Sequence, residues 1–209
     1  MYQSILIEID VGVGIITLNR PERQNVFDDV LFGELAAAIG QMADEPAVRV
    51  LVLSSTGQSF CAGAENLGDS RALAEMLRRL AQCPKPTIAR IQGPAYGAGA
   101  GLLACCDVAI ATFDAEFSLA EVKSGLISAL IIPHFIAAIG ERHARRYMLT
   151  AERFSAAEAY RIGLLHELVT DDAALDEAVG KIVDALLNNQ SQALAECKEL
   201  IRGVAWRSS

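Results

Sequence analysis

Two short segments combine small residues in a way that can expose backbone N–H groups to a ligand. One reads Phe-Cys-Ala-Gly-Ala-Glu-Asn over 60–66, and the other reads Gly-Pro-Ala-Tyr-Gly-Ala-Gly-Ala-Gly over 93–101. Each follows an apolar run typical of a buried strand and precedes a helical pattern. Amides at a helix N-terminus are unpaired and partly positive, and small side chains leave them accessible. Two such turns side by side would suit a developing oxyanion, whereas close helix–strand packing explains either turn alone equally well.

Other catalytic patterns are absent or weak. The glycines from Gly97 to Gly101 have the wrong spacing for a dinucleotide-binding GxGxxG turn, and no Gly-Lys-Ser/Thr follows to make a phosphate loop. His134, His143 and His166 form neither a Ser/His/Asp order nor an HExxH pattern, so a structural or exposed role is the simplest expectation. His134, which follows Ile-Ile-Pro, is the histidine that could lie near a pocket.

Composition limits the class of protein. The chain has 209 residues, of which 52% are hydrophobic and 21% charged, enough for one substantial core. The net charge of −8 argues against nucleic-acid binding, and no apolar run reaches the roughly 18 residues of a membrane span. The N-terminus lacks the features of a secretion signal, and the five cysteines include no CxxC pair, which predicts free thiols in a cytoplasmic protein without a metal site.

Hydrophobic periodicity predicts strands and helices in alternation, and hence a single α/β domain over 1–209. We expect an N-terminal hairpin, then buried or short strands interleaved with helices, then mainly helices. The expected strands are 5–9, 12–18, 48–53, 87–91, 108–111 and 116–118, and the expected helices are 28–43, 70–82, 130–139, 141–149, 155–161, 172–188 and 192–202.

An ordered set of motifs resembles the crotonase (enoyl-CoA hydratase/isomerase) superfamily, in wording closest to bacterial methylglutaconyl-CoA hydratase-like proteins. The motifs are Asn19-Arg-Pro followed by Asn25, Ser59-Phe-Cys-Ala-Gly-Ala-Glu, Pro84-Lys-Pro-Thr-Ile-Ala, Gly93-Pro-Ala-Tyr-Gly-Ala-Gly, Cys106-Asp, Phe117-Ser-Leu-Ala-Glu, Gly140-Glu-Arg-His-Ala-Arg-Arg-Tyr-Met-Leu-Thr, and Ala157 and Ala159 followed by Gly163-Leu. The resemblance implies an α/β fold, a crotonase-like spiral of ββα units with two roughly perpendicular sheets. Residues 1–140 would form the spiral core and 141–209 a helical trimerisation region, shorter than is usual in the family. It further implies a homotrimer or hexamer.

The same resemblance implies an acyl-CoA site without metal, and with no cofactor beyond the coenzyme A moiety of the substrate. Ala62 and Ala98 would donate backbone N–H bonds to the thioester oxygen, and Glu121 would be the catalytic acid–base. The implied coenzyme A contacts are Arg23, Cys61, Ala62 and Ala64, and the implied substrate pocket contains Glu65, Gly97, Gly101, Leu126 and His134.

Two departures from the family bear on function. Hydratases of the family use two glutamates, and the position of the first is Gly101, which has no side chain. The stretch from Glu65 to Arg71 is also shorter than usual. We therefore keep three hypotheses: a hydratase-type lyase that uses Glu121, an isomerase or decarboxylase of the same superfamily, and a catalytically weak acyl-CoA-binding protein.

Overall fold

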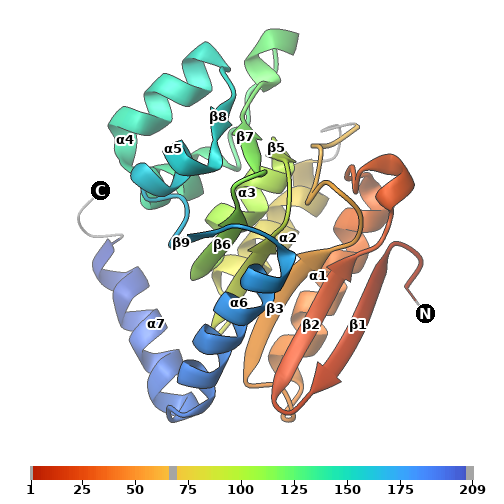
Figure 1. The fold of residues 1–209 in the computed structure, drawn as a ribbon, viewed down its shortest axis with the longest axis vertical. Coiled ribbons are helices and arrows are strands. Elements are labelled where there is room, and N and C mark those ends of the chain that lie inside the picture. Colours follow the sequence, from red (N-terminus) through yellow and green to blue (C-terminus); the bar gives the residue numbers. More distant parts are fainter. Residues whose placement is uncertain (1, 66–69, 206–209) are drawn as a thin grey trace.

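The computed structural model describes residues 2–65 and 70–205, which fold into two β-sheets with helices around them (Figure 1). The larger sheet has the strand order β1-β2-β3-β4-β6-β9, and the smaller has the order β5-β7-β8. The strands are β1 (Ile5–Asp10), β2 (Val13–Leu18), β3 (Val50–Ser55), β4 (Thr87–Ile91), β5 (Ala95–Tyr96), β6 (Val108–Thr112), β7 (Glu116–Ser118), β8 (Phe154–Ser155) and β9 (Glu167–Val169). All pairs in the larger sheet beyond the β1–β2 hairpin are parallel.

Seven α-helices and two short 3₁₀ helices lie within the described residues. They are η1 (Pro21–Arg23), α1 (Asp29–Asp44), α2 (Ser70–Ala81), α3 (Ala98–Ala104), η2 (Glu121–Ser124), α4 (Ile132–Thr150), α5 (Ala156–Arg161), α6 (Asp172–Leu187) and α7 (Ser191–Ala205). None of the helices in this part of the chain is long and apolar enough to cross a membrane.

Strand β3 shows why the larger sheet is covered on both faces. Its first four residues, Val-Leu-Val-Leu, are all buried, as expected of a strand inside a parallel sheet. Leu51 and Leu53 belong to the main core with α1, whereas Val50 and Val52 pack in a second cluster with Leu175 of α6. The period of two along the strand therefore sends alternate side chains to opposite helical layers.

The chain follows the expected ββα succession through its first 150 residues. The units β1-β2-α1, β4-β5-α3 and β6-β7-α4 each contain two strands and a helix. A further unit, β3-α2, lies between the first two of these. It has only one full strand, because isolated bridges at Cys61 and Ala64 take the place of a second strand. This turn of the spiral is the one that carries the first small-residue segment.

The part of the chain after residue 140 is mainly helical, as expected, and it also contributes two short strands. Strand β8 pairs with β7, and β9 pairs with β6. The break expected between helices 130–139 and 141–149 is real. Gly140 has φ 74° and ψ 158°, which interrupts the helical path inside α4.

A partly exposed polar cluster attaches α7 to the sheet. Asp107 accepts hydrogen bonds from the amide and the hydroxyl of Thr87, at 2.7 and 2.8 Å. The ammonium of Lys198 lies 2.5 Å from the same carboxylate oxygen and also donates to the carbonyl of Lys85. Asp107 thus connects β4 and α7 through one carboxylate oxygen, which gives it a structural position.

Replacing Asp107 by alanine should therefore destabilise the fold. The substitution leaves the buried Thr87 amide and the largely buried Lys198 ammonium without their partner, which costs about 2–4 kcal/mol in the free energy of unfolding. Asp176→Ala is the control, since this exposed carboxylate pairs with Arg90 at the surface and its loss should cost under about 1 kcal/mol. Urea unfolding of both variants measures the difference, and equal losses would contradict a structural role for Asp107.

Candidate active site

The two small-residue segments lie against each other through backbone hydrogen bonds. The Cys61 amide donates to the carbonyl of Pro94 at 3.1 Å, and the Tyr96 amide donates to the carbonyl of Cys61 at 2.9 Å. Gly99 makes the contact possible, because a Cβ there would lie 2.7 Å from Cys61 Cβ and 2.8 Å from its carbonyl oxygen. The structure thus confirms that the two turns are side by side.

Asn25 holds the loop before α1 against the first turn, a role that the sequence did not reveal. Its side chain is fully buried and donates to the carbonyls of Thr56 and Ser59, both at 2.9 Å, while its Oδ1 accepts from the Arg20 amide at 2.8 Å. Asn25 has φ 54°, a left-handed conformation that asparagine tolerates better than most residues. In the sequence, Asn25 is marked only as the end of a segment rich in turn-forming residues, 19–25, and as part of the first family motif.

The amide of Ala62 is already used inside the protein. It donates to the carbonyl oxygen of Gln24 at 3.0 Å, so the structure contradicts the expectation that Ala62 offers a free donor. Gly63, at φ 112°, reverses the chain, and its own carbonyl accepts from the Phe27 amide. The half-buried Ala64 follows, and its N–H has no acceptor among the residues that the structure describes.

Ala98 supplies the other unpaired amide. It is the first residue of α3, whose first helical bond runs from the Gly101 amide to the carbonyl of Gly97 at 2.9 Å. The positive φ of this turn falls on Gly97 (50°) and not on Ala98. An alanine at position 98 therefore needs no strained backbone, and its buried N–H remains without an acceptor among the described residues.

Glu121 reaches this turn from the other side. It begins η2, three positions after the last residue of β7, and its half-buried carboxylate has no hydrogen bond or ion pair within the described part of the chain. A Cβ on Gly97 would lie 2.5 Å from Glu121 Oε1 and 3.9 Å from the Cα of Gly63. Both turns and the carboxylate therefore converge at Gly97.

The position expected for a second acid faces a hydrocarbon wall. Gly101 is buried one turn into α3, and a Cβ there would lie 2.8 Å from Cγ1 of Ile131. Ile131 itself is fully buried at the start of α4. Two other carboxylates near the turns are paired, Glu65 with Arg23 and Glu116 with Tyr96 and Arg153, whereas Glu121 has no such partner among the described residues.

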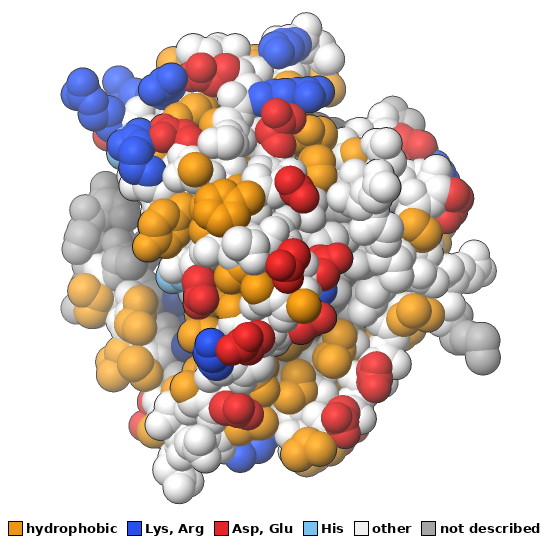
Figure 2. Space-filling model, viewed as in Figure 1, with side chains coloured by type: hydrophobic (Ala, Val, Ile, Leu, Met, Phe, Trp, Pro, Cys, Tyr) orange, Lys and Arg blue, Asp and Glu red, His pale blue; other side chains and the backbone are white. Residues whose placement is uncertain are grey.

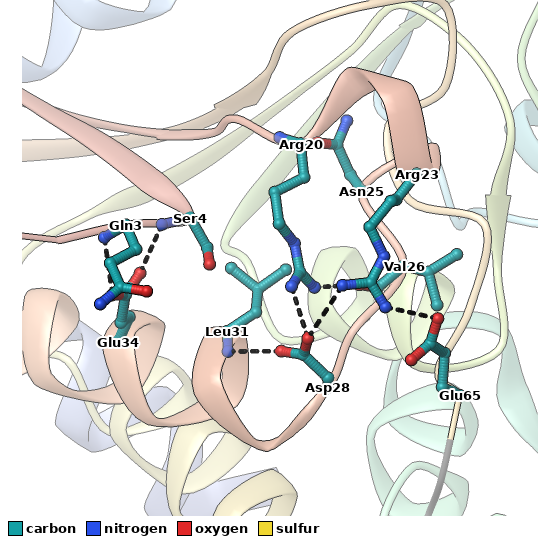
Figure 3. Close-up of polar contacts among 10 residues, drawn as sticks. All are labelled: Gln3, Ser4, Arg20, Arg23, Asn25, Val26, Asp28, Leu31, Glu34 and Glu65. Carbon is teal, nitrogen blue, oxygen red and sulfur yellow. Dashed lines mark hydrogen bonds and ion pairs between the residues drawn. The ribbon is translucent and has the colours of Figure 1, made fainter.

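Arg23 and Glu65, expected at the coenzyme A and substrate sites, pair with each other (Figure 3). Arg23 Nη2 lies 2.6 Å from Glu65 Oε1, and its Nη1 lies 3.4 Å from Asp28 Oδ2. Asp28 also pairs with Arg20 at 2.5 Å and caps α1 by accepting from the Leu31 amide at 2.9 Å. The two guanidinium groups beside the first turn are therefore matched by two carboxylates.

Cys61 has a structural position. Its backbone groups bond to the second turn, its Sγ contacts the carbonyl of Gly63 at 3.4 Å, and burial raises the pKa of its thiol to about 12. The thiol stays protonated at neutral pH, so it is not a nucleophile. The Cys61 amide, which was expected to contact coenzyme A, already donates to the carbonyl of Pro94.

Of the other two residues expected in the substrate pocket, Leu126 lies beside Glu121 and His134 lines a cleft. The Leu126 amide donates to the backbone carbonyl of Glu121 at 3.1 Å, and its side chain is 49% exposed. His134 lines a cleft of about 200 Å³ between α2 and the first turn of α4, with Leu77, Arg78 and Leu130 among its neighbours. Burial lowers the pKa of His134, which keeps the imidazole neutral at pH 7.

A second cleft, of about 660 Å³, lies over α4 and α5 and shares no residue with the turns. It is lined by Glu141, Arg142, His143, Arg145, Arg146 and Arg161. Figure 2 shows basic side chains gathered at that end of the molecule, with acidic side chains spread over the rest of the visible face. Three of its arginines, Arg145, Arg146 and Arg161, pair with glutamates.

The fold and the site define an α/β protein in which two backbone amides, unpaired within the described part of the chain, lie near the Glu121 carboxylate. Residues 8–205 match the model of the enoyl-CoA hydratase/isomerase family, and the chain belongs to this family of enzymes. The fold is the crotonase fold: the structure superposes on an enoyl-CoA hydratase from Shewanella pealeana with a TM-score of 0.93 and 36% identity, over 97% of this chain and 81% of that one.

Two curated relatives are named for different reactions. The enoyl-CoA hydratase ACTT6 of Alternaria alternata is 34% identical over 91% of this chain and 67% of its own length. The 1,2-epoxyphenylacetyl-CoA isomerase of Escherichia coli is also 34% identical, over 85% of this chain and 74% of its own length. Sequence similarity therefore establishes the family, whereas the type of reaction has to be inferred from the geometry of the site.

Gly97→Ala should disturb the site with little effect elsewhere. The added methyl would meet Glu121 Oε1 at 2.5 Å, and the positive φ of Gly97 disfavours alanine. We expect activity on an acyl-CoA substrate to fall at least about tenfold, because a 1 Å misplacement of a catalytic group can cost about 100-fold.

The matched control for this substitution is Gly33→Ala, on the exposed side of α1 with no atom within 4 Å of the new methyl. This variant should keep full activity and gain up to about 1 kcal/mol in stability. Steady-state kinetics on both proteins provides the comparison. Equal activity of the two variants would show that the Gly97 turn does not position Glu121.

Proposed function

We propose that this protein is an enoyl-CoA hydratase-type lyase that uses Glu121 as its single acid–base and the amides of Ala64 and Ala98 as oxyanion donors. The observation that carries the proposal is the convergence at Gly97 of both small-residue turns and the free carboxylate. Ala64 takes the place first given to Ala62, because the Ala62 amide is bonded to Gln24.

Hydration of an enoyl thioester requires donors for a developing oxyanion, which the two backbone amides would supply. When water adds to the β-carbon of an α,β-unsaturated thioester, the C–O bond forms, the π electrons move toward the carbonyl, and negative charge collects on the thioester oxygen. Two backbone N–H groups held in place before the reaction stabilise that charge without reorganising. The Ala98 amide adds the partial positive charge of a helix start.

One carboxylate can complete the proton transfers. Glu121 would accept the proton that water loses as its oxygen bonds to the β-carbon. The same carboxyl would then deliver a proton to the α-carbon as the enolate collapses to the thioester. One water is added and the carboxylate is regenerated, so the cycle balances without a second acid at position 101.

Isomerisation within the same site is the second candidate. Glu121 would remove a proton from one carbon of the acyl chain and return it to another, with the same oxyanion stabilised. The hydrocarbon wall at Ile131, which holds no polar group for a nucleophilic water, favours this alternative, as does the similarity to a relative named as an isomerase.

For the assembly, a homotrimer or hexamer stays a prediction, and the exposed apolar residues Leu200, Ile201 and Val204 of α7 offer a contact surface.

Mass spectrometry of enoyl-CoA thioesters incubated with the protein in heavy water separates these reactions. We expect the gain of one water, with deuterium at the α-carbon. Double-bond migration or deuterium exchange without added water would replace the hydratase by the isomerase. An unchanged panel of straight-chain, branched and carboxylated thioesters would overturn both.

Glu121→Gln should lower kcat about 100- to 10,000-fold, the usual contribution of a positioned acid–base group, and leave the affinity for the thioester largely unchanged. Glu199→Gln, an equal change on the exposed face of α7, should have no effect on kcat. Turnover measured alongside coenzyme A binding tests both points. Full activity of the Glu121 variant would remove this residue from the mechanism.

A further inference from the structure

The contact between Gly101 of α3 and Ile131 at the start of α4 is unusually close. A Cβ at position 101 would lie 2.8 Å from Cγ1, 3.0 Å from Cδ1 and 3.1 Å from Cγ2 of Ile131. Well-packed interiors leave no room for atoms at such distances without a shift of the neighbour. Three side-chain carbons of one residue thus occupy the volume that any side chain at position 101 would enter.

Ile131 cannot move aside easily. Its side chain is fully buried and β-branched, which restricts its rotamers. Its amide donates to the carbonyl of Ser128 at 2.9 Å, and its carbonyl accepts from the amides of His134 and Phe135, both at 3.1 Å. The backbone is therefore fixed as the first turn of α4.

We propose that Ile131 is a specificity-determining residue that limits this active site to one carboxylate. Together with Gly101 it forms a coupled pair: the isoleucine requires the glycine, and the glycine leaves the isoleucine the volume that a side chain at position 101 would need. The inference rests on the proposed function for its catalytic meaning, while the coupling itself is a property of the packing. Changing Gly101 alone cannot add a second acid, whereas changing both residues can.

A stability cycle tests the coupling without any turnover. Gly101→Ala should lower the melting temperature by about 5 °C, although alanine is the better helix former. Combined with Ile131→Ala, the loss should be clearly smaller than the sum of the two single losses. Gly180→Ala, in α6 with no atom within 4 Å of the new methyl, should not lower the melting temperature, and Gly101→Ala with Ile139→Ala should be additive. Additive losses in the Ile131 cycle would overturn the proposal.

An activity comparison tests the catalytic consequence. Gly101→Glu with Ile131→Ala should hydrate an enoyl-CoA at least about tenfold faster, in kcat/KM, than the isosteric Gly101→Gln with Ile131→Ala. Its pH profile should show a further ionisation on the acid side. Equal rates and equal profiles would overturn the role of Ile131 in specificity. A wild-type protein that does not hydrate any thioester would overturn the proposed function alone, since the stability cycle is independent of it.

Discussion

The site depends on how closely two stretches of backbone approach each other. Gly99 lies so near Cys61 that even a methyl group would overlap both its Cβ and its carbonyl, and Gly97 is similarly confined by Glu121. The hydrogen bonds between Cys61 and the 94–96 segment lock this approach, and Asn25 braces the first turn from behind. The close approach of the two segments therefore requires glycine at positions 97 and 99. The accessible backbone amides follow from this lack of side chains.

Charge near the site is balanced rather than concentrated. The chain has a net charge of −8, and the two arginines closest to the first turn are paired with Asp28 and Glu65. An anionic ligand such as a phosphate would have to compete with the exposed Glu65 carboxylate for Arg23. Because exposed pairs of this kind are worth only about 0–1 kcal/mol, exchange of Glu65 for a phosphate is energetically accessible.

Most of the fold could be predicted from the sequence because strand and helix periods are local properties. The continuous apolar run of β3 and the positions of the two turns are examples. The direction of an N–H group was not predictable in this way. Whether Ala62 or Ala64 faces a ligand depends on the backbone angles of Gly63, and on Gln24, which lies 38 residues earlier and takes up the Ala62 amide. The Gly101–Ile131 contact joins residues 30 positions apart, and no local pattern signals it. The short strands β8 and β9 were missed for the same reason, since pairing with β7 and β6 defines them.

The loss of an acid at position 101 and the presence of Ile131 are best understood as one feature. Gly101 alone would leave a gap between α3 and the start of α4, and Ile131 fills it with hydrocarbon. Because Ile131 occupies the volume that a side chain at position 101 would need, no carboxylate fits there unless Ile131 changes as well. Under the proposed function, the packing of α3 against the start of α4 therefore leaves Glu121 as the acid–base in both candidate reactions.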